Sequence, residues 1–266
     1  MIVSITQRMA ESAKGALDGK IAIVTGSGRG IGRAIATGYA AAGASVCCGA
    51  RSEREITETV SLITGAGGSA IAVQTDVQDL ASVETMVART VDAFGGIDIL
   101  VVNHAVQPTA GPVEQTDPME WRETIGVNLI GAYHCMRSVV PRLKARGAGK
   151  IIVVGSGQGH RGSAGQTAYA SSKAGIWMMV QSVAQELAPF NISVNELLPG
   201  HVHTKIYRDA TANYGGGAPG DAQKPKNLRP AEWLKEPEDV VPLALFLACQ
   251  PDIGPTAQSF SLMRRF

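Results

Sequence analysis

Seven short apolar runs, separated by stretches of helical composition, constrain the fold of this 266-residue chain most strongly. Two of them, residues 20–25 (KIAIVT) and 150–154 (KIIVV), are almost continuously apolar, without polar alternation. Such strands are buried on both faces, which is typical of a parallel sheet covered by helices. The other runs are residues 45–50, 70–77, 98–102, 192–198 and 258–263. The sequence therefore predicts α/β architecture, a single doubly wound Rossmann domain with a seven-stranded parallel sheet flanked by helices.

The rest of the chain is organised around that domain. Residues 1–18 are expected to form an N-terminal arm, and residues 19–266 the catalytic domain. Residues 204–234, which include a glycine-rich stretch, are expected to form a lid over the substrate. Residues 117–118 (Asp-Pro) mark the start of a helix that should run to about residue 137 and stop near Pro141.

Composition excludes several classes of function. The chain has 24 Lys and Arg against 23 Asp and Glu, a formal net charge of +1, which argues against nucleic-acid binding through a general basic field. No membrane span or signal peptide is expected in the first 19 residues. The four cysteines form no CxxC pair, and Cys47 and Cys48 lie inside a predicted strand. They are interpreted as small core residues of a cytoplasmic protein.

A glycine-rich turn follows the first predicted strand and precedes a helix. It reads TGSGRGIG over residues 25–32. Glycines permit a tight turn and close approach of a pyrophosphate, and the helix amino terminus offers free N–H groups and a positive dipole end. In this context the turn predicts dinucleotide binding. The expected contacts are Gly26, Ser27, Arg29, Gly30, Ile31 and Gly32.

The end of the second strand distinguishes between the two nicotinamide dinucleotides. An NAD enzyme usually has an acidic residue there to bind the ribose hydroxyls. This chain has Arg51 followed by Ser52 instead. Arg51 and Arg29 are suited to grip a 2′-phosphate, so NADP is favoured and NAD is less likely. Asp76, after the third strand, is expected to accept a hydrogen bond from the adenine amino group.

Four residues form the predicted catalytic set. Tyr169 and Lys173 are four residues apart and share one face of a helix, so the lysine is expected to lower the pKa of the tyrosine. Ser156 lies at the end of the fifth strand, where open α/β sheets place their sites. Asn128 lies within a helix, where asparagine is a poor choice on propensity.

Together with the glycine turn, these residues resemble the short-chain dehydrogenase/reductase family over about residues 19–263. The chain is similar to members of the 3-oxoacyl-carrier-protein reductase type. The resemblance implies that Tyr169 donates or accepts the proton and that Ser156 donates a hydrogen bond to the substrate oxygen. It implies that Lys173 binds the nicotinamide ribose and tunes Tyr169, and that Asn128 holds a water in a proton relay. An NADP-dependent enzyme interconverting a ketone and a secondary alcohol of a small molecule is expected.

The resemblance also extends the cofactor site and implies an assembly. Tyr169 and Lys173 count among the expected cofactor contacts, with Val77, Asn103, Ala105, Pro199, Gly200, Val202 and Thr204. A homotetramer is expected, built on the helix from residue 117 and the helix near Tyr169. The chain departs from the family at His104 and Val106, where Asn and Gly are usual, and in its carboxyl-terminal segment.

Three alternatives remain open. The first is a non-catalytic nicotinamide-binding regulatory or scaffold protein, against which the complete catalytic set argues. The second is an epimerase or dehydratase, which usually has a larger carboxyl-terminal part. The third is a metal site at His160, His201 and His203, whose spacing gives no closed ligand set, so no metal is expected. His160 and Arg161 are interpreted either as ligands of a polar or anionic substrate group or as a solvated turn.

Overall fold

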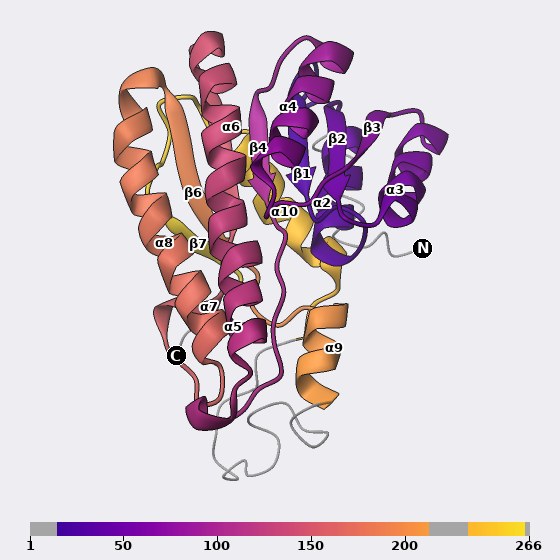
Figure 1. The fold of residues 1–266 in the computed structure, drawn as a ribbon. Helices are drawn as coiled ribbons and strands as arrows, with labels where there is room; N and C mark the ends of the chain where they lie inside the picture. Colours follow the sequence, from indigo (N-terminus) through magenta and orange to yellow (C-terminus); the bar gives the residue numbers. More distant parts are fainter. Residues whose placement is uncertain (1–14, 213–233, 264–266) are drawn as a thin grey trace, which may run out of the picture.

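One sheet of seven parallel strands forms the centre of the computed structural model, which describes residues 15–212 and 234–263 (Figure 1). The strand order is β3-β2-β1-β4-β5-β6-β7, which confirms the predicted doubly wound fold. Every neighbouring pair is parallel. The strands are β1 (Ile21–Thr25), β2 (Ser45–Ala50), β3 (Ser69–Gln74), β4 (Ile99–Val102), β5 (Gly149–Val154), β6 (Ile192–Leu198) and β7 (Ser259–Ser261).

Helices cover both faces of the sheet, as its apolar strands require. The longer helices are α2 (Gly30–Ala41), α3 (Glu53–Gly65), α4 (Leu80–Phe94), α5 (Pro118–Ile125), α6 (Gly131–Arg146), α8 (Thr167–Leu187), α9 (Lys205–Ala212) and α10 (Val241–Ala248). The short ones are α7 (Gly157–His160), η1 (Val113–Gln115), η3 (Ala188–Phe190), η4 (Pro237–Val240) and the π-helical η2 (Gly126–Ile130). Helices α2, α3 and α10 contribute to one apolar core, and α4, α6 and α8 to the other.

Successive strand residues supply the two cores alternately. In β1, Ala22 and Val24 pack on the α2 side, whereas Ile23 packs on the α4 side. Cys47 and Cys48 divide in the same way, and both are fully buried free thiols. Burial raises the pKa of Cys47 to about 11 and that of Cys48 to about 12, so both stay protonated. Their interpretation as core residues is confirmed.

The helix that begins after Asp117 differs from its predicted length. Asp117 caps it and Pro118 occupies its first position, as the sequence indicates. It then passes through the π turn η2 and continues as α6 to Arg146, so the predicted stop near Pro141 is wrong. Val139 and Leu143, on either side of the proline, are fully buried against the sheet. Their packing offsets the hydrogen bond that the proline removes.

The predicted arm and lid lie largely outside the described residues. Of the arm, residues 15–18 are described, and Leu17 is buried in the core with its N–H bonded to the carbonyl of Ala42. Of the lid, Thr204 and helix α9 are described, and residues 213–233 are not. Within the described ranges, no helix combines the length and apolarity needed to cross a bilayer.

Candidate active site

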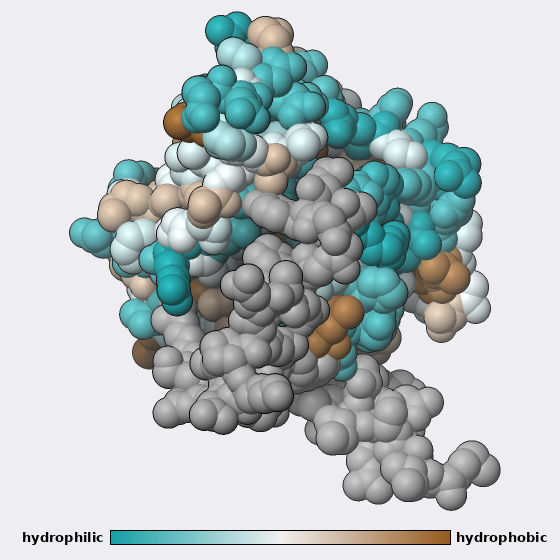
Figure 2. Space-filling view, turned by 90° about the horizontal axis from the view of Figure 1, so that it is seen from below, coloured by the Kyte–Doolittle hydropathy of each residue, from teal (hydrophilic) through white to brown (hydrophobic). Residues whose placement is uncertain are grey.

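The strand order reverses between β1 and β4, and a cavity of about 1030 Å³ opens along the carboxyl ends of the strands. Open α/β sheets bind their ligands at such a switch point. The cavity is lined by every predicted site residue except Ser27, Gly32 and Asn128. Figure 2 views the molecule from the end where α9 lies, and its described surface there is mostly hydrophilic, with isolated hydrophobic side chains.

The glycine turn between β1 and α2 forms one wall. Gly26 and Gly30 have φ angles of +63° and +54°, which L side chains rarely adopt. No side chain caps the start of α2, so the first N–H groups of the helix are available to an anionic ligand. The backbone of this turn therefore fits the pyrophosphate of a dinucleotide.

Two glycine-turn residues have packing roles. Ser27 is fully buried and lies off the cavity, with its carbonyl accepting a hydrogen bond from Thr59. A Cβ on Gly32 would lie 2.2 Å from the carbonyl oxygen of Gly26 and 2.4 Å from Nδ2 of Asn103. Gly32 therefore allows α2 to start close against the turn. The sequence predicted both as cofactor contacts because spacing alone does not show which glycine-turn residues face outward.

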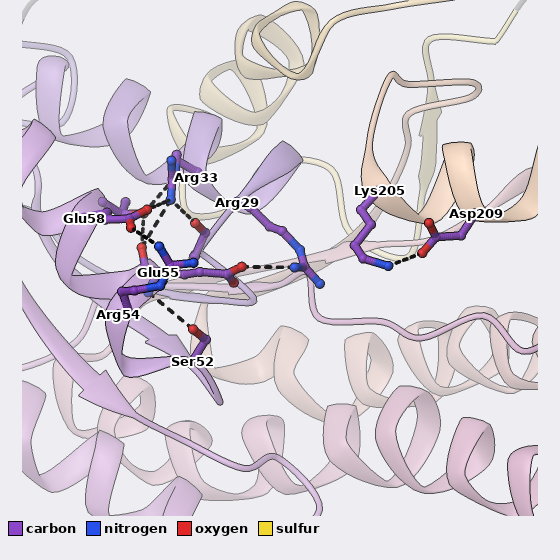
Figure 3. Close-up of polar contacts among 10 residues, drawn as sticks. Arg29, Arg33, Ser52, Arg54, Glu55, Glu58, Lys205 and Asp209 are labelled. Carbon is purple, nitrogen blue, oxygen red and sulfur yellow. Dashed lines mark hydrogen bonds and ion pairs between the residues drawn. The ribbon is translucent and has the colours of Figure 1, made fainter.

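Arg29 and Arg51 both line the cavity near the start of α3 and are more than half exposed. Arg29 lies 3.0 Å from the carboxylate of Glu55, as the dashed line in Figure 3 marks. Arg51 lies 3.8 Å from Glu123. Exposed pairs of this kind contribute little to stability, so both guanidinium groups remain available to a ligand.

Glu55 is a cavity residue that the sequence analysis missed. Ser52 caps α3 by accepting a hydrogen bond from the Glu55 N–H, as Figure 3 shows. The Ser-x-x-Glu spacing at residues 52–55 is a capping signal that would have placed Glu55 in the first turn of that helix. There it lies against the glycine turn, because a Cβ on Gly28 would approach its Cβ to 2.8 Å.

Asn103, after β4, joins that strand to the glycine turn. Its Nδ2 donates to the carbonyls of Thr25 and Gly26, at 3.1 and 3.2 Å, and its N–H donates to the Thr25 hydroxyl. Asp76 and Val77 line the cavity after β3, where Asp76 Oδ1 accepts a hydrogen bond from the Gln78 N–H. Asn103 is thus a clamp on the turn as well as a cavity residue.

His104, one of the departures from the family pattern, also contacts the turn. Its Nδ1 lies 2.8 Å from the Thr25 hydroxyl, and its Nε2 is buried. Burial, together with the charge of Lys173, lowers the pKa of His104 to about 3, against a hydrogen bond to the backbone of Val127 that raises it. His104 is therefore a neutral imidazole at the floor of the cavity.

This pKa makes folding sensitive to acid. Between pH 6.5 and 3 the unfolded chain protonates His104 while the folded chain does not, so the free energy of unfolding falls as pH falls. Between pH 6.5 and 5, the free energy of unfolding should therefore fall by up to about 2 kcal/mol less in His104→Asn than in the wild type. Urea unfolding at the two pH values measures it, with exposed His203→Asn as control. Equal losses in wild type and His104→Asn would contradict the assignment.

The catalytic set converges at the carboxyl end of β5. Ser156 follows β5 and caps α7, while Tyr169 and Lys173 lie in the first two turns of α8. The Ser156 hydroxyl hydrogen bonds with Tyr169, and Lys173 Nζ donates to the carbonyl of Val154 at 2.8 Å. Ser156, Tyr169 and Lys173 therefore lie together in one cavity.

The electrostatics of the set differ from the sequence expectation. Burial raises the pKa of Tyr169, and it is the Ser156 hydroxyl that opposes this rise. Lys173 Nζ lies 5.8 Å from the centre of the Tyr169 ring and is bonded instead to the strand carbonyl. Burial lowers the pKa of Lys173 itself to about 8, with Glu196 opposing the fall. The spacing of four residues on a helix places Lys173 and Tyr169 on one face, but it does not show which hydrogen-bond acceptor the lysine contacts.

Asn128 lies in the π turn η2 and is fully buried. Its side chain makes a reciprocal pair with the backbone of Val106, accepting from the N–H at 2.8 Å and donating to the carbonyl at 2.9 Å. It also donates to the hydroxyl of Ser172 on α8. Asn128 thus joins the loop after β4 to the catalytic helix through its side chain, which does not line the cavity.

The segment after β6 closes the other side of the cavity. Pro199 and Gly200 follow the strand, and Val202 pairs with Lys235 in an isolated bridge. Thr204 approaches the glycine turn, because a Cβ on Gly30 would lie 3.3 Å from its methyl group. The remaining wall consists of residues outside the predicted catalytic and cofactor set, among them Gln107, Gln158, Gln166, His201, Tyr207 and Met263. Arg161, considered above as a ligand of a polar or anionic substrate group, also lines the cavity.

Each of the three histidines considered for a metal site contacts a different side chain. His160 contacts Glu196, His201 stacks on Tyr207, and His203 lies 3.3 Å from Glu236. No group of three or more His, Cys, Asp or Glu side chains suited to a metal is present in the described ranges. His160 also departs from the substrate-side position considered for it, since its Nε2 is directed to a buried carboxylate.

Comparisons with known proteins agree with this geometry. The family model for short chain dehydrogenase matches residues 20–215. The chain is 36% identical to the 3-oxoacyl-acyl-carrier-protein reductase FabG of Vibrio harveyi, over 87% of this chain and 91% of the relative. It is 37% identical to the L-rhamnose 1-dehydrogenase (NAD(P)(+)) of Azotobacter vinelandii, over 86% and 89%. A crystal structure from Beutenbergia cavernae with NADP bound at low occupancy superposes with a TM-score of 0.81, at 34% identity over 93% and 96%.

Proposed function

Because the chain belongs to the short-chain dehydrogenase family and is an oxidoreductase, we propose that it interconverts a ketone or 3-oxo group and a secondary alcohol of a small molecule, with NADP as cofactor. The observation that carries this proposal is the meeting of Ser156, Tyr169 and Lys173 in a cavity that the glycine turn also lines. A non-catalytic binding protein would have no need of this buried set.

The residues divide the work of the proposed reaction. The bound nicotinamide supplies or accepts the hydride at the substrate carbon. When a ketone is reduced, negative charge grows on its oxygen, and the hydroxyls of Ser156 and Tyr169 stabilise it by hydrogen bonds. Tyr169 transfers its proton to that oxygen, and in the oxidation of an alcohol it accepts the proton instead.

Lys173 and Asn128 support these two hydroxyls. In this proposal the ammonium group of Lys173 holds the nicotinamide ribose beside Tyr169. Asn128 joins the Val106 loop to Ser172 on the helix that carries Tyr169 and Lys173. In this proposal it also serves the proton relay, through a water held at η2. Proton exchange with solvent would then pass along these residues.

A screen of activities tests the proposal. The protein is incubated with NADPH or NADH and with 3-oxoacyl thioesters, keto sugars, oxidised polyols, steroid ketones and small ketones. We expect loss of the nicotinamide absorbance with at least one ketone class, together with NADPH binding detected by fluorescence. NADPH binding without turnover of any ketone or alcohol would favour the scaffold alternative.

Arg51 and Arg29 support NADP rather than NAD. Both line the cavity beside the start of α3, and β2 ends without an acidic residue. Glu55 and Glu123 hold the two guanidinium groups at 3.0 and 3.8 Å, and a 2′-phosphate offers them a doubly charged partner. The remaining proposed contacts are the cavity residues of the glycine turn, β3, β4 and β6 named above.

Arg51→Asp tests this preference. A hydrogen bond to a charged group is worth about 1.5–3 kcal/mol, so we expect the Kd of NADPH to rise about 10- to 100-fold. The NADH affinity should improve, because the aspartate can accept from the ribose hydroxyls. Arg54→Asp is the matched control, since Arg54 lies one turn away, is 81% exposed and pairs with Glu58 instead (Figure 3). Tighter NADH than NADPH binding by the wild type would contradict the proposal.

We also propose that the enzyme is a homotetramer in the cytoplasm. Apolar side chains are exposed along the helices expected to pair, namely Met119, Trp121, Ile130, Tyr133 and Met178. The buried reduced thiols suit a reducing compartment. Light scattering should give about four times the 27.7 kDa chain mass, and Ile130→Asp with Met178→Asp should give smaller species. A wild-type monomer at micromolar concentration would exclude the tetramer.

A further inference from the structure

A carboxylate is buried in the middle of β6, directly behind the catalytic residues. Glu196 is fully buried, between Val153 of β5 and Ser259 of β7. Burying a carboxylate is costly unless it is paired and hydrogen bonded. His160 Nε2 lies 2.7 Å from its Oε2, and the Ser259 hydroxyl donates to the same atom at 2.5 Å. Its Oε1 is buried and has no hydrogen-bond partner in the described ranges.

The second carboxylate oxygen of Glu196, Oε1, packs against the backbone of Gly155, which lies between Ser156 and the residue that binds Lys173. A Cβ on Gly155 would lie 1.9 Å from Glu196 Oε1, so the carboxylate packs against a position that only glycine fits. On one side of Gly155 is Val154, whose carbonyl holds the ammonium group of Lys173. On the other side is Ser156. One side chain therefore lies behind the chain segment that serves both catalytic residues.

His160 connects the same carboxylate to the other end of α7. Ser156 caps this one-turn helix and His160 is its last residue. The His160 ring lies against Trp177 of α8, with centroids 4.9 Å apart. The contact with Glu196 therefore fixes the end of the turn that Ser156 begins.

The charge of Glu196 also acts on Lys173. Three ionisable groups influence the lysine or lie near it: Tyr169 on its own helix, His104 after β4 and Glu196 on β6. His104 is neutral, and Tyr169 is protonated until it reacts. Glu196 is the negative group among them, and it opposes the fall in the pKa of Lys173 that burial causes.

We infer that Glu196 and His160 are positioning residues, which orient Ser156 through the α7 turn and keep Lys173 charged through the carboxylate. The inference rests on the catalytic roles proposed above for Ser156 and Lys173. The two residues do not touch the cavity, so they act through their neighbours. The two residues differ in what they contribute. His160 takes part only in the contact that fixes the end of α7, whereas Glu196 takes part in that contact and also supplies the negative charge near Lys173.

Two variants separate these effects. Glu196→Gln keeps the shape and removes the charge, and His160→Gln removes the ring and leaves the charge. We expect kcat to fall about 10- to 100-fold in both, because displacing a catalytic group by a fraction of an ångström to 1 Å has effects of this size. In Glu196→Gln alone, the alkaline limb of the pH profile of kcat/KM should move to lower pH, since Lys173 loses its proton more easily.

A second measurement needs no substrate. Lys173 holds the nicotinamide ribose in the proposal, so the affinity for NADPH, followed by fluorescence, should weaken as pH rises past the pKa of Lys173. We expect the midpoint to fall in Glu196→Gln and to stay unchanged in His160→Gln. Glu84→Gln, which removes an exposed carboxylate paired with Arg137, controls for the loss of one negative charge.

The outcomes are distinct. If both variants melt at lower temperature but keep the wild-type kcat and pH profiles below their melting points, the pair is merely structural and the inference is wrong. An unchanged NADPH midpoint in Glu196→Gln overturns the electrostatic role whether or not a substrate is known. A wild type that binds NADPH but reduces no ketone overturns the proposed function, and the binding midpoints then still decide the role of Glu196.

Discussion

Tyr169→Phe should lower kcat about 100- to 10,000-fold, the range that general acid–base groups contribute. Tyr169 is hydrogen bonded to Ser156 at the carboxyl end of β5 and is the proposed proton donor to the substrate oxygen. The substitution removes one hydroxyl and keeps the ring, so the fold should be preserved and the affinity for NADPH should change far less than kcat. Steady-state kinetics with any active ketone, combined with fluorescence titration of NADPH, measures both quantities.

Tyr133→Phe is the matched control for that variant. Tyr133 is half exposed on α6, outside the cavity lining, so loss of its hydroxyl should leave kcat unchanged. A Tyr169→Phe enzyme that retains more than a tenth of wild-type kcat, while hydride transfer is rate-limiting, would show that another group supplies the proton. The proposed role of Tyr169 would then be wrong even though the family assignment stands.

Ser156→Ala should lower kcat about 100- to 1000-fold, as removal of one donor from an oxyanion site does. It should also move the pH profile. The Ser156 hydroxyl lowers the pKa of Tyr169, so its loss raises that pKa, and the rate of alcohol oxidation should begin to rise at higher pH than in the wild type. The measurement is kcat/KM for oxidation from pH 6 to 10.

Ser171→Ala, an exposed position on α8, controls for the loss of a serine hydroxyl. If Ser156→Ala loses activity without any movement of the pH profile, the serine stabilises the substrate oxygen alone. If neither kcat nor the profile changes, Ser156 has no part in the reaction. Each result separates the two effects that the hydroxyl has in this geometry.

Local patterns were sufficient to predict the sheet and most of the cavity. The strands of a parallel sheet are apolar on both faces, so runs such as residues 150–154 are visible in the sequence. Because the carboxyl ends of those strands meet at one edge, residues that follow β1, β4, β5 and β6 line a common cavity. The position of Ser156 relative to Tyr169 could be predicted for the same reason.

Interactions between distant segments could not be read from those patterns. Pro141 predicts a helix end, but the burial of Val139 and Leu143 against the sheet keeps the helix intact. The position of His160 after Ser156 suggests a substrate ligand, but its partner is Glu196, on a strand 36 residues away. A glutamate within a predicted strand does not by itself predict such a contact, because the free energy of burying its carboxylate depends on neighbours whose positions the sequence does not give.

The central pairing of β1 with β4 has a consequence for synthesis of the chain. Thr25 in β1 bonds to Val101 in β4, 76 positions further along. At about 5–20 residues per second, a ribosome needs roughly 4–15 s to span that distance. During this interval β2 can pair with one edge of β1, and β3 with β2, while the other edge of β1 exposes unpaired N–H and C=O groups. The nascent amino-terminal half is therefore a half-sheet with an open edge, and chaperone protection is most valuable to it before residue 102 leaves the exit tunnel.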